Sequence, residues 1–228
     1  MRYLIRLFVF SITVFLSYPS FATVIVDTGV TPCVQYQPCG GIGINNRSGI
    51  QSSAAAEFTL TETTVLTDLF LWMGTFFQVG NDFTMAIYAD GGDIPQATNE
   101  LYSSAVVITD TGDEDDYNNQ WQGLTGLSWL LDPGEYWLAA EVRDGQTYRG
   151  YLPGSRLVSV PNPVPNYAFL HTPNGSWLSD ESLDFSVRIE GDLVAVPEPA
   201  SIYLLMVMLF FVAISSKRNI WFRKDIRL

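Results

Sequence analysis

Residues 183–190 read Leu183-Asp184-Phe185-Ser186-Val187-Arg188-Ile189-Glu190, a strict alternation of apolar and polar side chains. Successive side chains of a β-strand point to opposite faces, so the four apolar residues share one face and the four polar residues share the other. The pattern predicts a strand with one buried side and one exposed side.

The same period of two recurs through the middle of the chain. Further strands are expected over residues 55–60, 69–73, 83–87, 102–109, 127–131, 135–142, 147–152 and 167–170. Gly, Pro, Asn and Asp residues separate these runs, and no long stretch carries a helical apolar stripe. The middle is therefore predicted to be all-β, an antiparallel β-sandwich of the jelly-roll type over residues 54–192.

Residues 1–22 have the pattern of a secretory signal peptide, which the Sec export machinery would read. Arg2 and Arg6 form a positive front, an apolar run follows, and small residues surround a cut between Ala22 and Thr23. An uncleaved anchor helix is the alternative, but the apolar run is short for a span that needs about 20 residues.

A second apolar stretch lies near the other end of the chain. Residues 200–216 are predicted to form a transmembrane helix, and the basic tail 217–228, which includes Lys217 and Arg218, follows it. Seventeen helical residues rise about 25 Å, close to the thickness of a hydrocarbon core. The positive flank should stay cytoplasmic, which places the rest of the chain on the outer side of the inner membrane.

The linker 193–199 ends in Pro197-Glu198-Pro199, directly before the apolar stretch. This motif, the helix and the basic tail together resemble the PEP-CTERM sorting signal of Gram-negative, exopolysaccharide-producing bacteria. The resemblance covers about the last 30 residues, and an ordinary tail anchor with a Pro-rich hinge is the alternative. It implies an exosortase as partner, which would remove the anchor and leave the protein at the cell surface or in the extracellular matrix. The two prolines would hold the segment extended.

Parts of the middle also resemble the β-sandwich ectodomains that occur ahead of such anchors. The matching stretches are residues 85–90, 131–138 and 185–191. This resemblance implies a fold and a context and does not imply a reaction.

The charge of the middle segment excludes one class of partner. The chain has 228 residues and 24 acidic residues, of which 23 precede the tail, whereas the segment between the two apolar ends has five Arg and no Lys. A net charge of about −18 repels the phosphate backbone, so nucleic acid is not expected as a partner.

Residues 23–53 are expected to be loop-rich and to carry the cysteine pair. Cys33 and Cys39 are close in sequence, and in an exported chain such a pair predicts a disulfide that closes a small loop. A redox or metal site is the alternative, but the spacing is not C-x-x-C and the chain has one histidine, His171.

No set of catalytic residues is evident. His171 is flanked by polar turn residues, which predicts an exposed loop position, and a nucleophile elbow is missing. No metal site with nitrogen or sulfur ligands is expected. An acidic loop contains Asp110, Asp113, Asp115 and Asp116, whose oxygens could hold Ca²⁺, but a solvated loop of repelling charges is the alternative.

Aromatic residues are abundant, and Trp121 and Trp177 lie beside polar turns, where an exposed ring could stack on a sugar. Packing within the sandwich is the alternative. The leading hypothesis is a non-enzymatic surface or matrix protein that contacts exopolysaccharide. A glycan-active enzyme with a carboxylate pair and a purely structural or adhesive module remain as alternatives.

Overall fold

The computed structural model describes the middle of the chain and a few residues beyond it. The described residues are 22–30, 41–47, 50–75, 78–110, 119–154, 163–171, 175–180 and 184–194, together with 206, 207 and 209. The chain divides into two compact units, residues 1–194 and residues 195–228.

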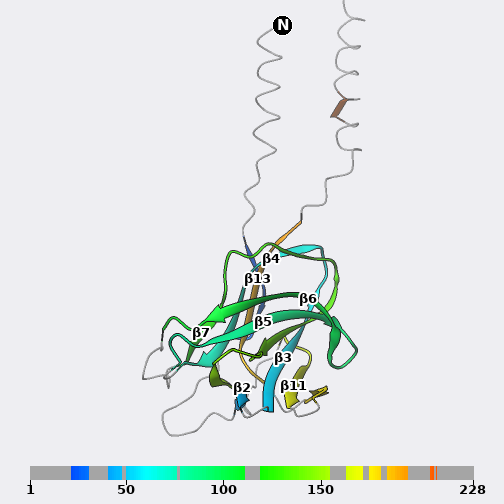
Figure 1. The fold of residues 1–228 in the computed structure, drawn as a ribbon. Helices are drawn as coiled ribbons and strands as arrows, with labels where there is room; N and C mark the ends of the chain where they lie inside the picture. The colour runs from blue at the N-terminus through cyan, green and yellow to red at the C-terminus, as the bar shows by residue number, and fades with distance from the viewer. Residues whose placement is uncertain are drawn as a thin grey trace, which may run out of the picture. The chain divides into compact units, whose positions relative to one another are not determined.

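The described residues of the first unit form 13 strands in two antiparallel sheets. Figure 1 shows how these strands are arranged. The smaller sheet has the order β1-β13-β4-β7, and β8 also pairs with β4. Its strands are β1 (Thr23–Asp27), β4 (Thr64–Gly74), β7 (Asn119–Leu124), β8 (Trp129–Leu131) and β13 (Val187–Leu193).

The larger sheet has the order β10-β2-β3-β9-β5-β6, and β11 pairs with both β3 and β12. Its strands are β2 (Gly41–Arg47), β3 (Ile50–Leu60), β5 (Asp82–Asp90), β6 (Pro95–Val107), β9 (Gly134–Glu141), β10 (Arg149–Pro153), β11 (Tyr167–His171) and β12 (Trp177–Ser179).

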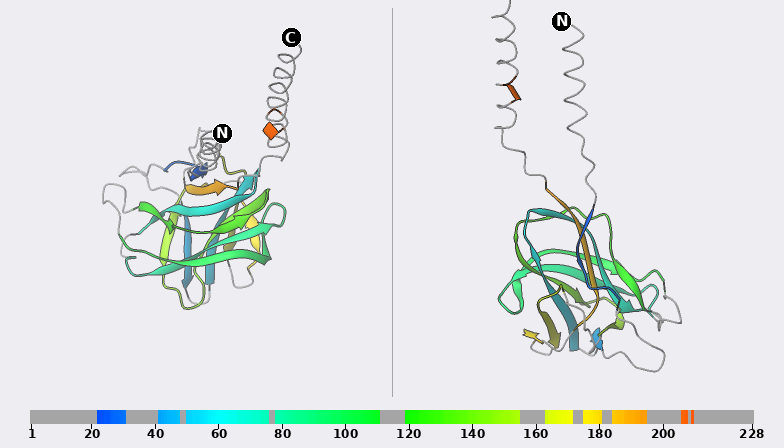
Figure 2. Two further views of the ribbon diagram at one scale, coloured as in Figure 1. Left: turned by 90° about the horizontal axis from the view of Figure 1, so that it is seen from above. Right: turned by 180° about the vertical axis from the view of Figure 1, so that it is seen from behind.

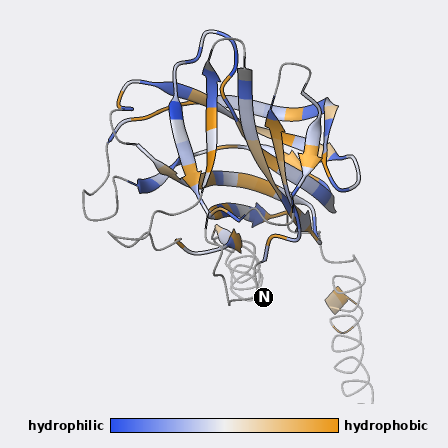
Figure 3. Cartoon of the chain, turned by 90° about the horizontal axis from the view of Figure 1, so that it is seen from below, coloured by the Kyte–Doolittle hydropathy of each residue, from blue (hydrophilic) through white to orange (hydrophobic). Residues whose placement is uncertain are grey.

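One hydrophobic core lies between the two sheets. Leu69 and Leu71 of β4 and Val187 of β13 contribute to it from the smaller sheet, and Met85 and Leu138 contribute from the larger sheet; all five are fully buried. Hydrophobic and hydrophilic positions alternate along the strands (Figure 3), as a sheet with one covered face requires. The all-β, antiparallel, two-sheet arrangement expected from the sequence is therefore confirmed.

All buried apolar side chains in the described part of the chain lie between Val26 and Ile189. Residues 23–194 thus contain the whole described core, which makes them a self-contained folding unit. The predicted helix 200–216 falls outside the described residues except for residues 206, 207 and 209, whose backbone is helical. Within the described part of the chain, no helix has the length and apolar character needed to cross a membrane.

The prediction of a loop-rich segment over residues 23–53 is wrong for much of that range. β1 pairs with β13, β2 pairs with β10, and β3 already begins at Ile50. The glycines of β2 led to the error, but Gly41 is needed within the sheet because a Cβ there would press against the Leu152 carbonyl of β10. The described fold therefore begins at Thr23, not at residue 54.

Candidate functional site

The predicted signal-peptide cut lies immediately before the described fold. Ala22 is exposed, and Thr23 opens β1 and pairs with Gly191 of β13. β13 then ends at Leu193, and Figure 2 shows β1 and β13 side by side. Both ends of the folded unit consequently lie at the same end of the smaller sheet. The sorting residues Pro197, Glu198, Pro199, Lys217 and Arg218 lie outside the described residues.

Two other predicted sites fall largely outside the described residues. Neither Cys33 nor Cys39 is among them, and the same holds for Asp113, Asp115 and Asp116 of the acidic loop. Asp110 is described and exposed, and its backbone carbonyl accepts a hydrogen bond from the side-chain amide of Gln120. Among the residues that the structure describes, no group of His, Cys, Asp and Glu is arranged to hold a metal ion.

Trp121 is one of three aromatic residues that share the outer face of the smaller sheet. It pairs in register with Trp72 of β4, and the two rings meet edge to face with centroids 5.6 Å apart. Phe70 precedes Trp72 by two positions and so shares its face, opposite Gly123 of β7. All three rings are half-buried. Phe70, Trp72 and Trp121 are called the aromatic row below.

The guanidinium of Arg188 of β13 lies over one face of the Trp121 ring and covers it. Its carbon lies 5.0 Å from the centroid of the Trp121 ring, and its Nη2 lies 2.9 Å from Oδ2 of Asp27. The exposed parts of these half-buried rings can stack on a flat apolar surface, and the neighbouring ion pair can donate and accept hydrogen bonds. A sugar ring presents both kinds of partner, an apolar C–H face and hydroxyl groups at its edge.

The expectation that Trp177 is exposed is wrong. Trp177 is 4% exposed and packs against the outer face of the larger sheet, beside small residues such as Ala86 and Ala139. Its ring meets that of Tyr88 edge to face, with centroids 6.4 Å apart. The indole covers a sheet surface that would otherwise be open to water, which leaves its faces closed to a ligand.

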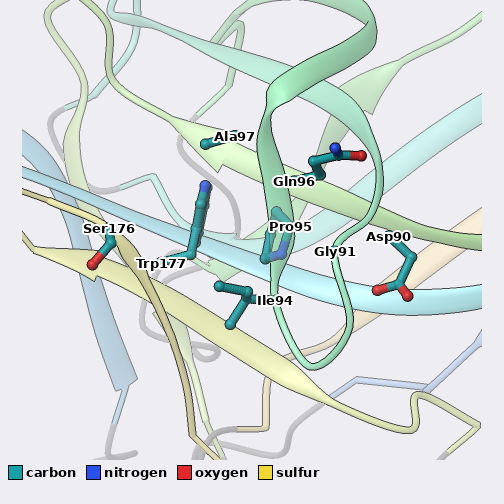
Figure 4. A pocket seen from close by; sticks show the side chains of 8 residues that line it. All are labelled: Asp90, Gly91, Ile94, Pro95, Gln96, Ala97, Ser176 and Trp177. Atoms are coloured by element: carbon teal, nitrogen blue, oxygen red, sulfur yellow. The ribbon is translucent and has the colours of Figure 1, made fainter.

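A pocket of about 360 Å³ lies beside Trp177 and is lined by the loop between β5 and β6. In Figure 4, Ile94 and Pro95 lie next to the indole, whereas the side chains of Asp90 and Gln96 lie on the other side of the loop. Asp90 is also engaged, since its Oδ1 accepts a hydrogen bond of 2.9 Å from Nε1 of Trp137. Asp90, Gln96 and Ser176 line the pocket together with apolar residues. Because the indole of Trp177 is almost fully buried, the aromatic row is the better candidate for stacking on a saccharide.

A network of charges spans β5, β6 and β9 on the outer face of the larger sheet. Arg143 donates from Nη2 to Glu100 at 2.6 Å and from Nε to Glu141 at 2.8 Å. The hydroxyl of Tyr88 donates to Glu141 at 2.8 Å. Sequence reasoning missed this network because its members are up to 55 residues apart and only the sheet brings them together.

The pKa shifts of Glu100 and Arg143 favour the charged form of each side chain. Burial alone would raise the pKa of Glu100, but hydrogen bonds from Ser103 and Arg143 outweigh it and lower that pKa. Burial would lower the pKa of Arg143, but its bonds to Glu100 and Glu141 raise it. Burial and the charge of Glu141 raise the pKa of Tyr88, so its hydroxyl stays protonated. The network is a fixed ion cluster.

Glu57 of β3 is a second buried carboxylate on the larger sheet. Its Oε2 accepts a bond of 2.6 Å from the amide of Asn166, and burial raises its pKa despite that bond. Glu57 pairs in register with Trp137, four positions from Glu141 along β9, so about 13 Å of strand separates the two acids. Glycosidase carboxylates lie about 5–9.5 Å apart. These two positions are therefore a poor match to that geometry.

The lone histidine lies at the end of β11 and not in a loop, although it is exposed as expected. His171 pairs in register with Ser52 of β3, and its Nδ1 is 2.8 Å from the Ser52 hydroxyl. A hydrogen bond between directly opposed residues is common in sheets. Within the described residues, no acid contacts the other ring nitrogen, so the pair is not completed to a triad.

Comparison of the chain with known proteins identified no related protein. The chain matches no protein-family model, and no curated protein matches it.

Proposed function

We propose that this chain is an exported, non-enzymatic protein of the cell surface or extracellular matrix, sorted through a PEP-CTERM anchor and in contact with exopolysaccharide. The observation that carries the proposal is the agreement between the predicted processing sites and the limits of the fold. β1 begins directly after the proposed signal-peptide cut, and β13 ends at the start of the proposed linker. Both processing events would leave every described strand intact.

Export would proceed in two steps under this proposal. Sec export and cleavage after Ala22 would release the amino end, while residues 200–216 would hold the unit at the inner membrane. Because Thr23 pairs with Gly191, the new amino terminus would lie beside the last residues of β13. An exosortase would then cut near Pro197-Glu198-Pro199 and free the sandwich. The proposal also includes the fold type: the strands of the sandwich would be connected in jelly-roll order.

The carboxylates support a non-enzymatic role. A glycan-active enzyme needs one carboxyl group that can give up a proton at the scissile bond. Glu100 and Glu141 are tied to Arg143, and the lowered pKa of Glu100 makes it a poor acid at neutral pH. Glu57 has the raised pKa of a proton donor, and the charges of Asp90, Glu135 and Asp93 add to that rise, but it is far along the sheet from the buried Glu141.

The aromatic row supports contact with a polysaccharide. Trp72 and Trp121 lie on neighbouring strands, and a flat sheet face can meet an extended chain of sugar units without a deep pocket. The strongly negative charge of the middle segment favours a neutral polysaccharide over an acidic one.

Mass spectrometry of the protein from its source organism tests the processing half of the proposal. The mature protein should begin at Thr23 and lack the tail beyond Pro199. Replacing Pro197-Glu198-Pro199 with three alanines should leave the full tail attached and the protein in the membrane fraction. A tail that persists in the unaltered protein would reject exosortase processing.

Binding of purified residues 23–194 to the producer's own exopolysaccharide tests the second half. Retention should exceed that of serum albumin and should fall in the Trp121→Ala variant. Leu130→Ala is the matched control, because it removes a half-exposed apolar side chain from the same sheet away from the aromatic row. Retention equal to albumin, or equal losses in both variants, would reject the aromatic row as the contact.

A further inference from the structure

Strand β6 forms an edge of the larger sheet and is its longest strand. It runs from Pro95 to Val107 and pairs with β5 on one side, and no described strand pairs with its other side. An edge strand presents unpaired N–H and C=O groups to any strand that approaches it. Proteins usually blunt such edges with charges, prolines, bulges or short length.

The first half of β6 carries these protections and the second half does not. Register shifts interrupt its pairing with β5 over Pro95–Leu101, and Glu100, the one charged residue of the strand, lies in this half. Residues 102–107 pair with β5 in regular register and contain no charge and no proline. The other described edge strands, β1, β7, β8, β10 and β12, have at most six residues each. The second half of β6 is thus the longest unprotected edge among the described strands.

We infer that this edge is a dimer interface, at which β6 of a second copy pairs antiparallel with it around a two-fold axis at Ser104. In that register, Leu101 lies opposite Val107 of the other copy. These are the exposed large apolar residues of the strand, 37% and 54% exposed. Ser103 likewise lies opposite Ala105. The two larger sheets then join into one continuous sheet.

The sequence of the strand favours a second copy over an unrelated strand. A two-fold interface must be complementary to itself, so each residue has to suit the residue at the mirrored position. Around Ser104, apolar residues meet apolar residues and small residues meet small residues. The seam from Leu101 to Val107 carries no charge, so two copies of a strongly acidic protein can meet there without direct repulsion at the contact.

Sedimentation velocity on residues 23–194 tests the inference independently of any sugar. The unaltered unit should shift from monomer to dimer mass as concentration rises, and added salt should strengthen the dimer by screening the net charge. Ser104→Asp should abolish the dimer, because it places two carboxylates face to face on the axis. Ser179→Asp is the control, since it adds the same charge at an exposed position of β12, which pairs with β11 and not with β6, and it should leave the dimer intact.

A cross-link locates the interface directly. Under mild oxidation, Ser104→Cys should form a covalent dimer whose linked peptide joins residue 104 to residue 104, whereas Ser179→Cys should not. A unit that stays monomeric at all concentrations would overturn the inference. A dimer that survives Ser104→Asp, or one that is linked through another edge strand, would overturn it as well.

Discussion

Replacing Arg143 with Met should destabilise the sandwich by leaving two carboxylates without their cation. Met keeps much of the apolar stem of the arginine, so the change removes charge and hydrogen bonds more than packing. Glu141 has a side chain only 8% exposed and would lose its bond of 2.8 Å to Nε. Glu100, which is 34% exposed, would lose its bond of 2.6 Å to Nη2.

The magnitude follows from those two contacts. A hydrogen bond to a charged group contributes about 1.5–3 kcal/mol, and the bond to the buried Glu141 should fall within this range. Solvent screens the bond to Glu100, which should contribute at most about 1 kcal/mol. The expected loss is about 2–3 kcal/mol, or roughly 5–10 °C in Tm for a unit of this size.

The loss should depend on pH in a defined direction. Because the folded protein lowers the pKa of Glu100 below its ordinary value of 4.5, the ion pair stabilises the fold above that value. The contribution disappears as pH falls through the lower pKa of the folded state. The difference in Tm between the Arg143→Met variant and the unaltered protein should therefore shrink below about pH 4.5.

Thermal unfolding of residues 23–194, followed by circular dichroism from pH 7 to pH 3.5, measures both effects. Arg149→Met is the matched control, because Arg149 is exposed and its removal changes the net charge equally. That control should change stability by less than about 0.5 kcal/mol. Equal losses in the two variants, or a loss for Arg143→Met that is the same at pH 3.5 as at pH 7, would contradict a stabilising role for the two ion pairs.

Three further substitutions test other parts of the fold in the same unfolding assay. Glu57→Gln should raise Tm at pH 7, because burial raises the pKa of Glu57 and the ionised form is costly there; the gain should vanish below about pH 4.5. Gly123→Ala should cost more than about 2 kcal/mol and loosen β7, since a Cβ there would overlap the carbonyl of Leu69, and a neutral result would contradict the close approach. Tyr148→Phe should cost about 1–2 kcal/mol by removing its buried bond of 2.6 Å to the Gly74 carbonyl, and an unchanged Tm would show that bond to be unimportant.

The fold could be predicted from sequence wherever an apolar alternation was long enough to reveal a buried face. Phe185, Val187 and Ile189 are buried as expected, although the described strand begins only at Val187. Strand β7 was not predicted, because the sequence Asn119–Leu124 shows little alternation of apolar and polar residues. It becomes a strand through its pairing with β4, which is a tertiary contact that no local pattern records.

The candidate site was harder to predict than the fold, because local surroundings did not distinguish Trp121 from Trp177. Both follow polar segments, yet Trp121 keeps a half-buried ring in the aromatic row while Trp177 is covered. The difference arises from the partners that each strand meets. β12 lies next to β11, so its indole reaches a sheet face lined by small residues such as Ala55 and Ala86, where a large ring fits. Alanines at outward positions of neighbouring strands are a sequence signal for such a covered face, and they can be read only once the order of the strands is known.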